Sequence, residues 1–149
     1  MIGTLNSLQI ENFLRSEVIG RLGCSAKGKP YVVPIAYVFD GKDIYSHTKE
    51  GLKTTMMRQN PTVCFEVDHI HDMANWQSVI VWGKYEELKG KKAEEALQAI
   101  VNRIHPISNS EVSVPRHSLE RPHAVTNPDV KLVVFRIRIE NASGKYEKQ

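Results

Sequence analysis

Residues 31–39, YVVPIAYVF, constrain the fold of this chain more than any other stretch. In an extended conformation, apolar side chains occupy both sides of this segment. Tyr31, Val33, Ile35, Tyr37 and Phe39 fall on one side, and Val32, Ala36 and Val38 on the other. A strand that is apolar on both faces is buried on both faces. In a chain of 149 residues, this pattern predicts the wall of a β-barrel that also meets a second chain.

Pro34 stands in the middle of this strand and lacks the N–H group that a sheet ladder uses. We therefore expect strand pairing to be broken at this position. One explanation is a bulge or an edge strand. The other is that the backbone groups of Val33 and Ile35 are released to bond a ligand. The edge of a flavin ring, with its alternating N–H and C=O groups, would suit such a strand.

Short extended runs and turn sequences recur along the chain. Tight turns are expected at AKGKP and DGKD, and Gly83 marks an expected bulge or a point of close backbone approach. Consecutive strands joined by tight turns favour an antiparallel barrel over a Rossmann sheet. The fold class predicted is mainly β with flanking helices (β+α), with six strands. These strands are expected at residues 19–25, 31–39, 44–47, 62–67, 76–88 and 132–139.

Three helices are expected beside the strands. The first lies near the N-terminus with Ser7 as its N-cap, and the third is an amphipathic helix at residues 91–104. The second covers residues 50–59, turns Leu52, Met56 and Met57 inward, and ends at Asn60-Pro61. Residues 105–129 are expected to form an irregular loop, and residues 141–149 a frayed tail.

The composition fits a single domain spanning residues 1–149. The net charge of +3 is too small, and the basic residues too dispersed, to indicate a nucleic-acid partner. Neither a signal peptide nor an apolar run long enough to span a membrane is visible, so we expect a cytoplasmic protein. Cys24 and Cys64 are expected to be reduced thiols in the core.

Lys53 is placed unusually, in the first turn of the expected helix 50–59. A lysine there opposes the helix macrodipole, which favours anions at this end. The conflict disappears if an anion binds, because helix N–H groups, a lysine and a nearby hydroxyl form an ordinary phosphate site. His47, Thr48 and Gly51 lie just upstream. The alternative is a surface lysine without a ligand.

Other polar residues carry weaker signals. His47 is either a structural histidine or a ligand contact, and Ser78 is one hydroxyl among many. Core packing is the expected role of Trp82. The sequence DHIHD at 68–72 places His69 and His71 on one strand face between two aspartates, but no third ligand follows at a recognised spacing. We therefore predict no metal site.

With these residues identified, the chain resembles the pyridoxamine 5′-phosphate oxidase-like, FMN-binding split-barrel family. Within it, the chain is most similar to the nitroimidazole-resistance (nitroimidazole reductase-like) branch. The resemblance covers about residues 15–105. It rests on the run HTxxGxK at 47–53 followed by SVxxxG at 78–83, in this order and spacing. The sequence WQSV stands where true pyridoxamine phosphate oxidases have an arginine-rich pattern, which argues against the vitamin B6 reaction.

The resemblance implies a homodimer with FMN bound at the subunit interface of a split β-barrel. By position, Val33, Pro34 and Ile35 would line the flavin ring, and His47 and Thr48 would lie beside it. Lys53 would hold the phosphate, and Gln77 and Ser78 would contact the phosphoribityl end. His47 is the implied catalytic residue, as a proton donor or ligand clamp.

Two functions follow from this resemblance. The first is an FMN-dependent oxidoreductase in which NAD(P)H drives two-electron reduction of a small acceptor such as a nitroaromatic. The second is a non-catalytic flavin or haem binder that serves in buffering, stress response or sensing.

Overall fold

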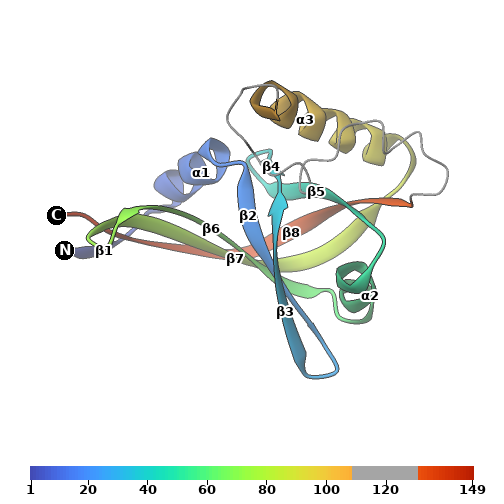
Figure 1. Ribbon diagram of the computed structural model, residues 1–149, viewed down its shortest axis with the longest axis horizontal. Coiled ribbons are helices and arrows are strands. Elements are labelled where there is room, and N and C mark those ends of the chain that lie inside the picture. The colour runs from blue at the N-terminus through green and yellow to red at the C-terminus, as the bar shows by residue number, and fades with distance from the viewer. Residues whose placement is uncertain (109–130) are drawn as a thin grey trace.

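A computed structural model describes the backbone of residues 1–108 and 131–149, and the side chains of residues 1–104 and 131–149. The described chain forms a mostly antiparallel sheet with three helices (Figure 1). This confirms the β+α split-barrel fold expected from the sequence, and the barrel is not closed. The elements are β1 (Ile2–Thr4), α1 (Ser7–Ser16), β2 (Ile19–Ala26), β3 (Lys29–Ala36), β4 (Val38–Phe39), β5 (Asp43–Lys49), α2 (Leu52–Gln59), β6 (Thr62–Asp72), β7 (Asn75–Leu88), α3 (Gly90–Ser108) and β8 (Leu132–Glu147).

The sheet follows the order β3-β2-β6-β7-β8-β5-β4, and β1 pairs with β8. Six strands were expected, whereas the described residues form eight. One difference arises at Tyr37, which is fully buried and separates β3 from β4. Its hydroxyl donates to the Leu14 carbonyl at 2.7 Å and its ring packs edge-to-face on Phe65, so the chain bends into the core here. The other added strand is the three-residue β1.

Strands β6, β7 and β8 extend further than their hydrophobic patterns predict. The β6–β7 ribbon continues to the turn at Met73 and Ala74, although residues 69–72 are exposed. The tail from Asn141 is not frayed, because β8 pairs with β7 as far as Glu147. The predicted bulge is present, since the register between β7 and β8 shifts at Trp82/Gly83. Backbone pairing therefore stabilises segments whose side chains gain little from burial.

The helices match the prediction in place but differ in detail. Asn6, not Ser7, caps α1, because the Asn6 side chain accepts from the Gln9 N–H at 2.8 Å and Gln9 reciprocates. In α2, Met56 and Met57 are buried as expected, but Leu52 is exposed. Helix α3 begins at Gly90 and continues to Ser108, four residues into the predicted loop. The rest of that loop, residues 109–129, lies outside the described residues.

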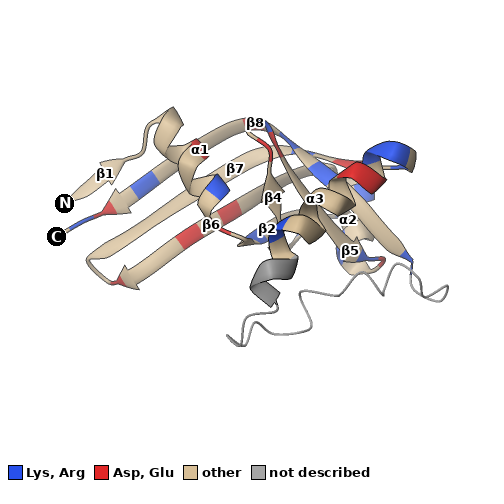
Figure 2. Cartoon of the chain, turned by 90° about the horizontal axis from the view of Figure 1, so that it is seen from above, with Lys and Arg blue, Asp and Glu red and all other residues tan. Residues whose placement is uncertain are grey.

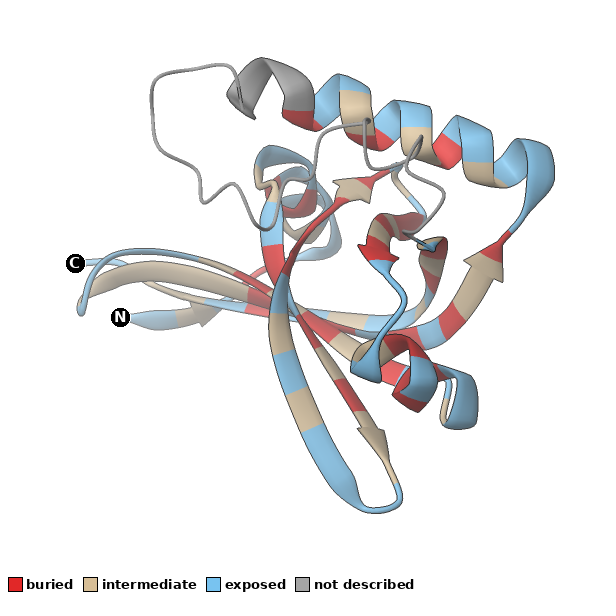
Figure 3. Cartoon of the chain, turned by 45° about the vertical axis from the view of Figure 1, so that its right-hand side comes forward, coloured by how far each residue is buried: buried red, intermediate tan, exposed pale blue. Residues whose placement is uncertain are grey.

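The two faces of the sheet are covered differently. Its inner face carries the main core, which includes Phe65, Phe135 and Ile137 and is covered by α1 and α2. Helix α3 packs on the opposite face through Ile100 and Ile104, which contact Ala36. The β2–β3 hairpin projects from the body and is exposed along much of its length (Figures 1 and 3).

A row of direct cross-strand neighbours remains uncovered beyond α3: Val32, Gly23, Cys64 and Trp82. Direct partners in an antiparallel ladder share one face, so we call the surface around this row the outer face. Val32 is 66% exposed and Trp82 41% exposed. The prediction that Trp82 packs in the core is therefore wrong for a single chain.

Charges of both signs are interspersed along the strands and helices (Figure 2). Among the described residues, no helix has the length and apolar character needed to cross a membrane.

Candidate functional site

The start of α2 brings together a buried hydroxyl and a half-buried lysine. Thr54 is fully buried, and its hydroxyl accepts from the Gly51 N–H at 3.0 Å and donates to the Gly51 carbonyl at 2.8 Å. This pair of bonds fixes the first turn, where Lys53 is half-buried. The first turn contains no acidic residue. The local structure thus holds a cation at the end of the helix that attracts anions.

The surroundings of Lys53 leave its charge uncompensated. Within the described part of the chain, Lys53 makes no ion pair with any carboxylate. Burial lowers the pKa of the Lys53 ammonium, and the nearby Cys24 thiol has the opposite, smaller effect. Arg58 at the other end of α2 contrasts with it, since Arg58 pairs with both Glu50 and Glu87. A bound anion would supply the missing countercharge at Lys53.

His47 and Thr48 lie on β5, close before this helix. Thr48 is buried on the face that also carries Ile44 and Ser46, and its hydroxyl donates to the Lys49 carbonyl at 3.2 Å. His47 is half-buried and lies opposite Val134 of β8, on the other face. Because side chains alternate along a strand, His47 and Thr48 point to opposite faces. Tyr45, on the same face as His47, packs against the residues that meet α3.

Pro34 lies on an edge strand, and the ladder continues past it without a break. Among the described residues, strand β3 pairs only with β2, in a continuous register from Ile19↔Ala36 to Ala26↔Lys29. In the same register, the Tyr37 N–H donates to the Val18 carbonyl at 3.0 Å. Bonded and non-bonded pairs alternate in antiparallel ladders, so Pro34 falls in a non-bonded pair. Its missing N–H therefore faces outward and disturbs no pairing.

This geometry corrects the expectation for the neighbouring residues. The backbone groups of Val33 and Ile35 face β2, whereas those of Val32, Pro34 and Ala36 face outward. The Ala36 carbonyl indeed accepts from the Ser46 hydroxyl at 2.7 Å, away from β2. The side chains of Val33 and Ile35 point to the inner core. Any ligand that bonds the outer edge of β3 would thus use Val32 or the Pro34 carbonyl.

Gln77 and Ser78 are neighbours on β7, and they too face opposite sides. The Ser78 hydroxyl donates to Glu66 at 2.9 Å, next to an Arg21 side chain that lies 2.6 Å from Asp68 and 3.3 Å from Glu66. Burial raises the pKa of the Glu66 carboxyl, and its hydrogen bond with Asp68 adds to the rise. This cluster is not predicted from the sequence, although charged residues at alternate positions of an apolar strand are its signal.

In one chain, the predicted site residues do not all converge. Lys53 lies near Cys24, and the register places Cys24 in the same row as Val63 and Gly83. Ser78 lies five residues from Gly83 along β7, which is a separation of roughly 17 Å at the usual strand rise. Val33, Ile35 and Thr48 share the inner face, whereas Pro34, His47 and Ser78 belong to the opposite face.

The two histidines of DHIHD line a pocket of about 370 Å³ at the far end of the β6–β7 ribbon, together with Gln77. Among the described residues, no three His, Cys, Asp or Glu side chains gather closely enough to hold a metal ion. His105, His117 and His123 lie beyond the side chains that the structure describes.

Comparison with known proteins identifies a matching family and a related protein. A family model described as pyridoxamine 5′-phosphate oxidase matches residues 6–146. An uncharacterized protein of Rhizobium meliloti (strain 1021) is 37% identical over 70 residues, which cover 47% of this chain and 46% of that protein. The match therefore spans about half the length of the curated relative.

Solved structures extend the comparison to the whole chain. An FAD-binding protein from Mesorhizobium loti is 28% identical, with a TM-score of 0.80 over 100% of this chain and 98% of that one. A protein proposed to confer 5-nitroimidazole antibiotic resistance in Bacteroides thetaiotaomicron is 21% identical, with a TM-score of 0.70 over 98% and 89% of the two chains. An FAD-binding protein from Mycobacterium smegmatis is 18% identical, with a TM-score of 0.64 over 98% of both chains. The last two likenesses concern the fold alone.

Proposed function

Because the chain belongs to the pyridoxamine 5′-phosphate oxidase family, we propose that it is an FMN-dependent oxidoreductase that works as a homodimer. The observation that carries this proposal is Lys53, a half-buried cation at the start of α2 without a carboxylate partner among the described residues. A flavin phosphate supplies the countercharge. The similarity to the Mesorhizobium loti protein described as FAD-binding supports a flavin cofactor.

Different residues of the chain bind different parts of the cofactor. Lys53 and the exposed N–H groups of the first turn of α2 bind the phosphate. The flavin ring lies along the outer edge of β3, where Val32 and the Pro34 carbonyl offer outward backbone groups. His47 and Thr48 lie at the end of β5 beside the same region, and Ser78 adds a polar contact. When bound, FMN supplies two-electron chemistry between NAD(P)H and a small acceptor such as a nitroaromatic.

A second copy of the chain is needed to complete this site. Lys53 and Ser78 are separated along the sheet of one chain, and the residues beside the ring fall on two faces. The outer face supplies a surface for the second copy, because Val32, Trp82 and Ile80 are exposed there. Exposed apolar side chains on a sheet with an unpaired edge mark an interaction surface. A dimer formed across this face would bring residues of both copies to one cofactor.

The absorption spectrum of the purified protein, followed by turnover assays, tests the proposed function. We expect flavin bands in the blue and near-ultraviolet, and oxidation of NAD(P)H that depends on an added nitroaromatic. Protein that stays colourless in excess flavin would exclude the cofactor. A haem Soret band would point to the haem-binding alternative. Flavin-loaded protein that never oxidises a nicotinamide would be a binder and not an enzyme.

Replacing His47 tests its proposed role as a proton donor or ligand clamp. We expect His47→Ala to lower turnover with a nitroaromatic by about a hundredfold, the usual contribution of a general acid. The melting temperature should change little, because the side chain is half-buried and outside the main core. His47→Gln, which keeps hydrogen bonding but not proton transfer, should retain ligand binding better than alanine. A variant that only melts earlier, with turnover intact, would assign His47 a structural role.

A further inference from the structure

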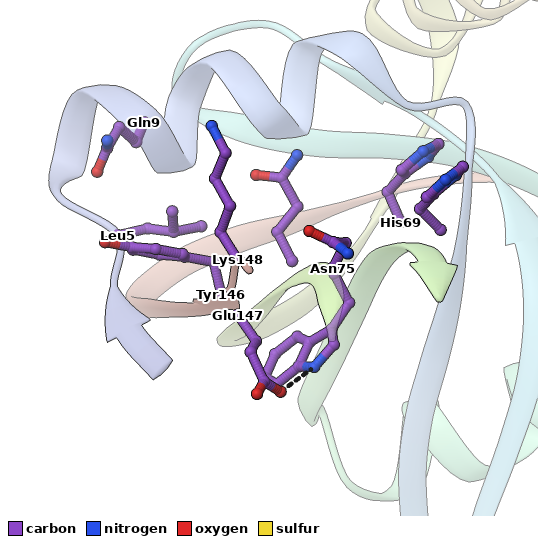
Figure 4. Close-up of a pocket in the computed structure, with 10 residues that line it drawn as sticks. Leu5, Gln9, His69, Asn75, Tyr146, Glu147 and Lys148 are labelled. Carbon is purple, nitrogen blue, oxygen red and sulfur yellow. Dashed lines mark hydrogen bonds between the residues drawn. The ribbon is translucent and has the colours of Figure 1, made fainter. Parts of the chain in front are cut away.

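A second pocket lies away from the start of α2. It has a volume of about 370 Å³, within the range of small-molecule sites, and opens between α1 and the end of the β6–β7–β8 ribbon. Leu5 and Tyr146 lie side by side at one side of it and His69 at the other, with Lys148 and Asn75 between them (Figure 4). The pocket is thus apolar at one end and polar at the other.

Tight packing on glycines fixes the apolar end. Leu5 is buried against Gly144, where an added Cβ would come within 2.8 Å of the Leu5 side chain, and its N–H donates to the Gly144 carbonyl at 2.9 Å. The Tyr146 ring lies on Gly3, where a Cβ would be 2.4 Å from the ring. Both side chains are therefore held in place without a ligand, and preorganisation of this kind favours binding.

The polar side chains of the pocket include donors that lack partners. Within the described residues, the side chains of His71, Gln77 and Lys148 make no hydrogen bond or ion pair. The nearby acids are already engaged: Glu147 accepts from the Trp76 indole at 3.0 Å, and Glu17 lies 3.7 Å from His69 Nδ1. Asn75 donates to both oxygens of Asp72. An ammonium, an imidazole and an amide remain to meet an acceptor.

We propose that this pocket is a second ligand site, and that it takes a planar aromatic carboxylate. The ring lies against Leu5 and Tyr146, and the carboxylate accepts from Lys148, Gln77 and His71. A carboxylate suits these groups because charge-assisted bonds to an ammonium are stronger than bonds between neutral partners. Gln77 belongs to this pocket, since it and Ser78 point to opposite faces of β7. The site does not depend on the flavin proposal.

Calorimetric titration of the full chain with benzoate tests this inference. We expect saturable binding of benzoate and at least tenfold weaker binding of benzamide, which has the same ring without the charge. Lys148→Met should weaken benzoate about tenfold, because a hydrogen bond to a charged group contributes about 1.5 kcal/mol or more. Lys145→Met is the matched control: it removes the same charge three residues earlier in the chain, but Lys145 lies opposite Ser78 on the other face.

Three results would overturn the inference. They are the absence of saturable heat with benzoate, equal binding of benzamide, and an equal loss of affinity in Lys145→Met. Flavin content, read from the visible absorption of each variant, separates this site from the cofactor site. It should be the same in Lys148→Met as in the unmodified chain, and loss of flavin from Lys148→Met would make the pocket part of the cofactor site instead.

Discussion

Lys53→Met is expected to weaken FMN retention by about ten- to a hundredfold. Methionine keeps the aliphatic stem in the half-buried position and removes the charge that we propose meets the phosphate. A charge-assisted hydrogen bond contributes about 1.5 to 3 kcal/mol, and each 1.4 kcal/mol is a factor of ten in affinity. Equilibrium dialysis of free FMN against each variant measures the change. Unaltered FMN affinity would exclude Lys53 as the phosphate ligand.

Lys91→Met is a closely matched control for this experiment. Lys91 is the second residue of α3, as Lys53 is of α2, so both lysines oppose a helix dipole. The Lys91 side chain is 87% exposed and lies near Glu95. If any lysine in a first turn supported flavin binding through the net charge of the protein, both variants would lose FMN. We expect the loss in Lys53→Met alone.

The stability of the flavin-free protein separates a cofactor role from a folding role. Burial lowers the pKa of Lys53 in the folded state, so the protonated form is less favourable there than in the unfolded chain. At neutral pH the ammonium therefore destabilises the fold, and the penalty declines as pH rises through the lowered pKa. Removing the charge should leave the flavin-free protein at least as stable at pH 7. A large loss of stability would mean that FMN loss reflects misfolding.

Much of this fold could be predicted from residue patterns because its strands alternate regularly. The runs at 19–25, 62–67 and 76–88 keep apolar side chains on one face, and all three form strands at those places. The ends of strands were predicted wrongly where backbone pairing extends the strand beyond the residues whose side chains are buried. Residues 68–72 and 141–147 have few apolar residues, yet both segments are paired, apart from His71 at a shift in register. Backbone hydrogen bonds do not depend on a particular pattern of side chains, so these extensions cannot be recognised in the sequence.

The candidate site was predictable in its chemistry and less so in its geometry. Lys53 stood out because its charge conflicts with the helix dipole, and this conflict is local. Which face of the sheet His47, Ser78 and Pro34 occupy depends on the register between strands that are far apart in the chain. A shift of one residue reverses every side chain. Pro34 illustrates this, since its effect on the ladder depends on which edge its missing N–H faces.

Trp82 links the sequence pattern to the proposed dimer. The sequence predicts that this residue is buried, and in one chain it is 41% exposed in the row with Cys64, Gly23 and Val32. Because Gly23 has no side chain, the surface of this row is lower at Gly23, between Val32 on one side and Cys64 and Trp82 on the other. A second copy packed across the outer face would bury Val32 and Trp82. The same contact would cover the unpaired edge at β3.

Trp82→Ala is therefore expected to turn the proposed dimer into a monomer at micromolar concentration. Loss of a buried aromatic anchor costs about 2 kcal/mol or more, which is about thirtyfold in the dissociation constant. A twofold interface contains the residue twice, so the expected weakening approaches a thousandfold. Light scattering coupled to size exclusion measures the mass, and the visible absorption of the same peak measures bound flavin. Both should fall together, because the proposed site draws on two chains.

Leu8→Ala provides the comparison. Leu8 is 66% exposed on α1, away from the outer face, and its removal should leave both mass and flavin content unchanged. Because Trp82 is itself partly exposed in the single chain, its replacement should not unfold the protein, and circular dichroism of the monomer can establish this. An unmodified chain that is already monomeric, or a Trp82→Ala protein that remains dimeric, would remove the outer face as the interface. A monomer that still holds FMN would show that one chain suffices to bind it, and that Lys53 reaches the phosphate without a second copy.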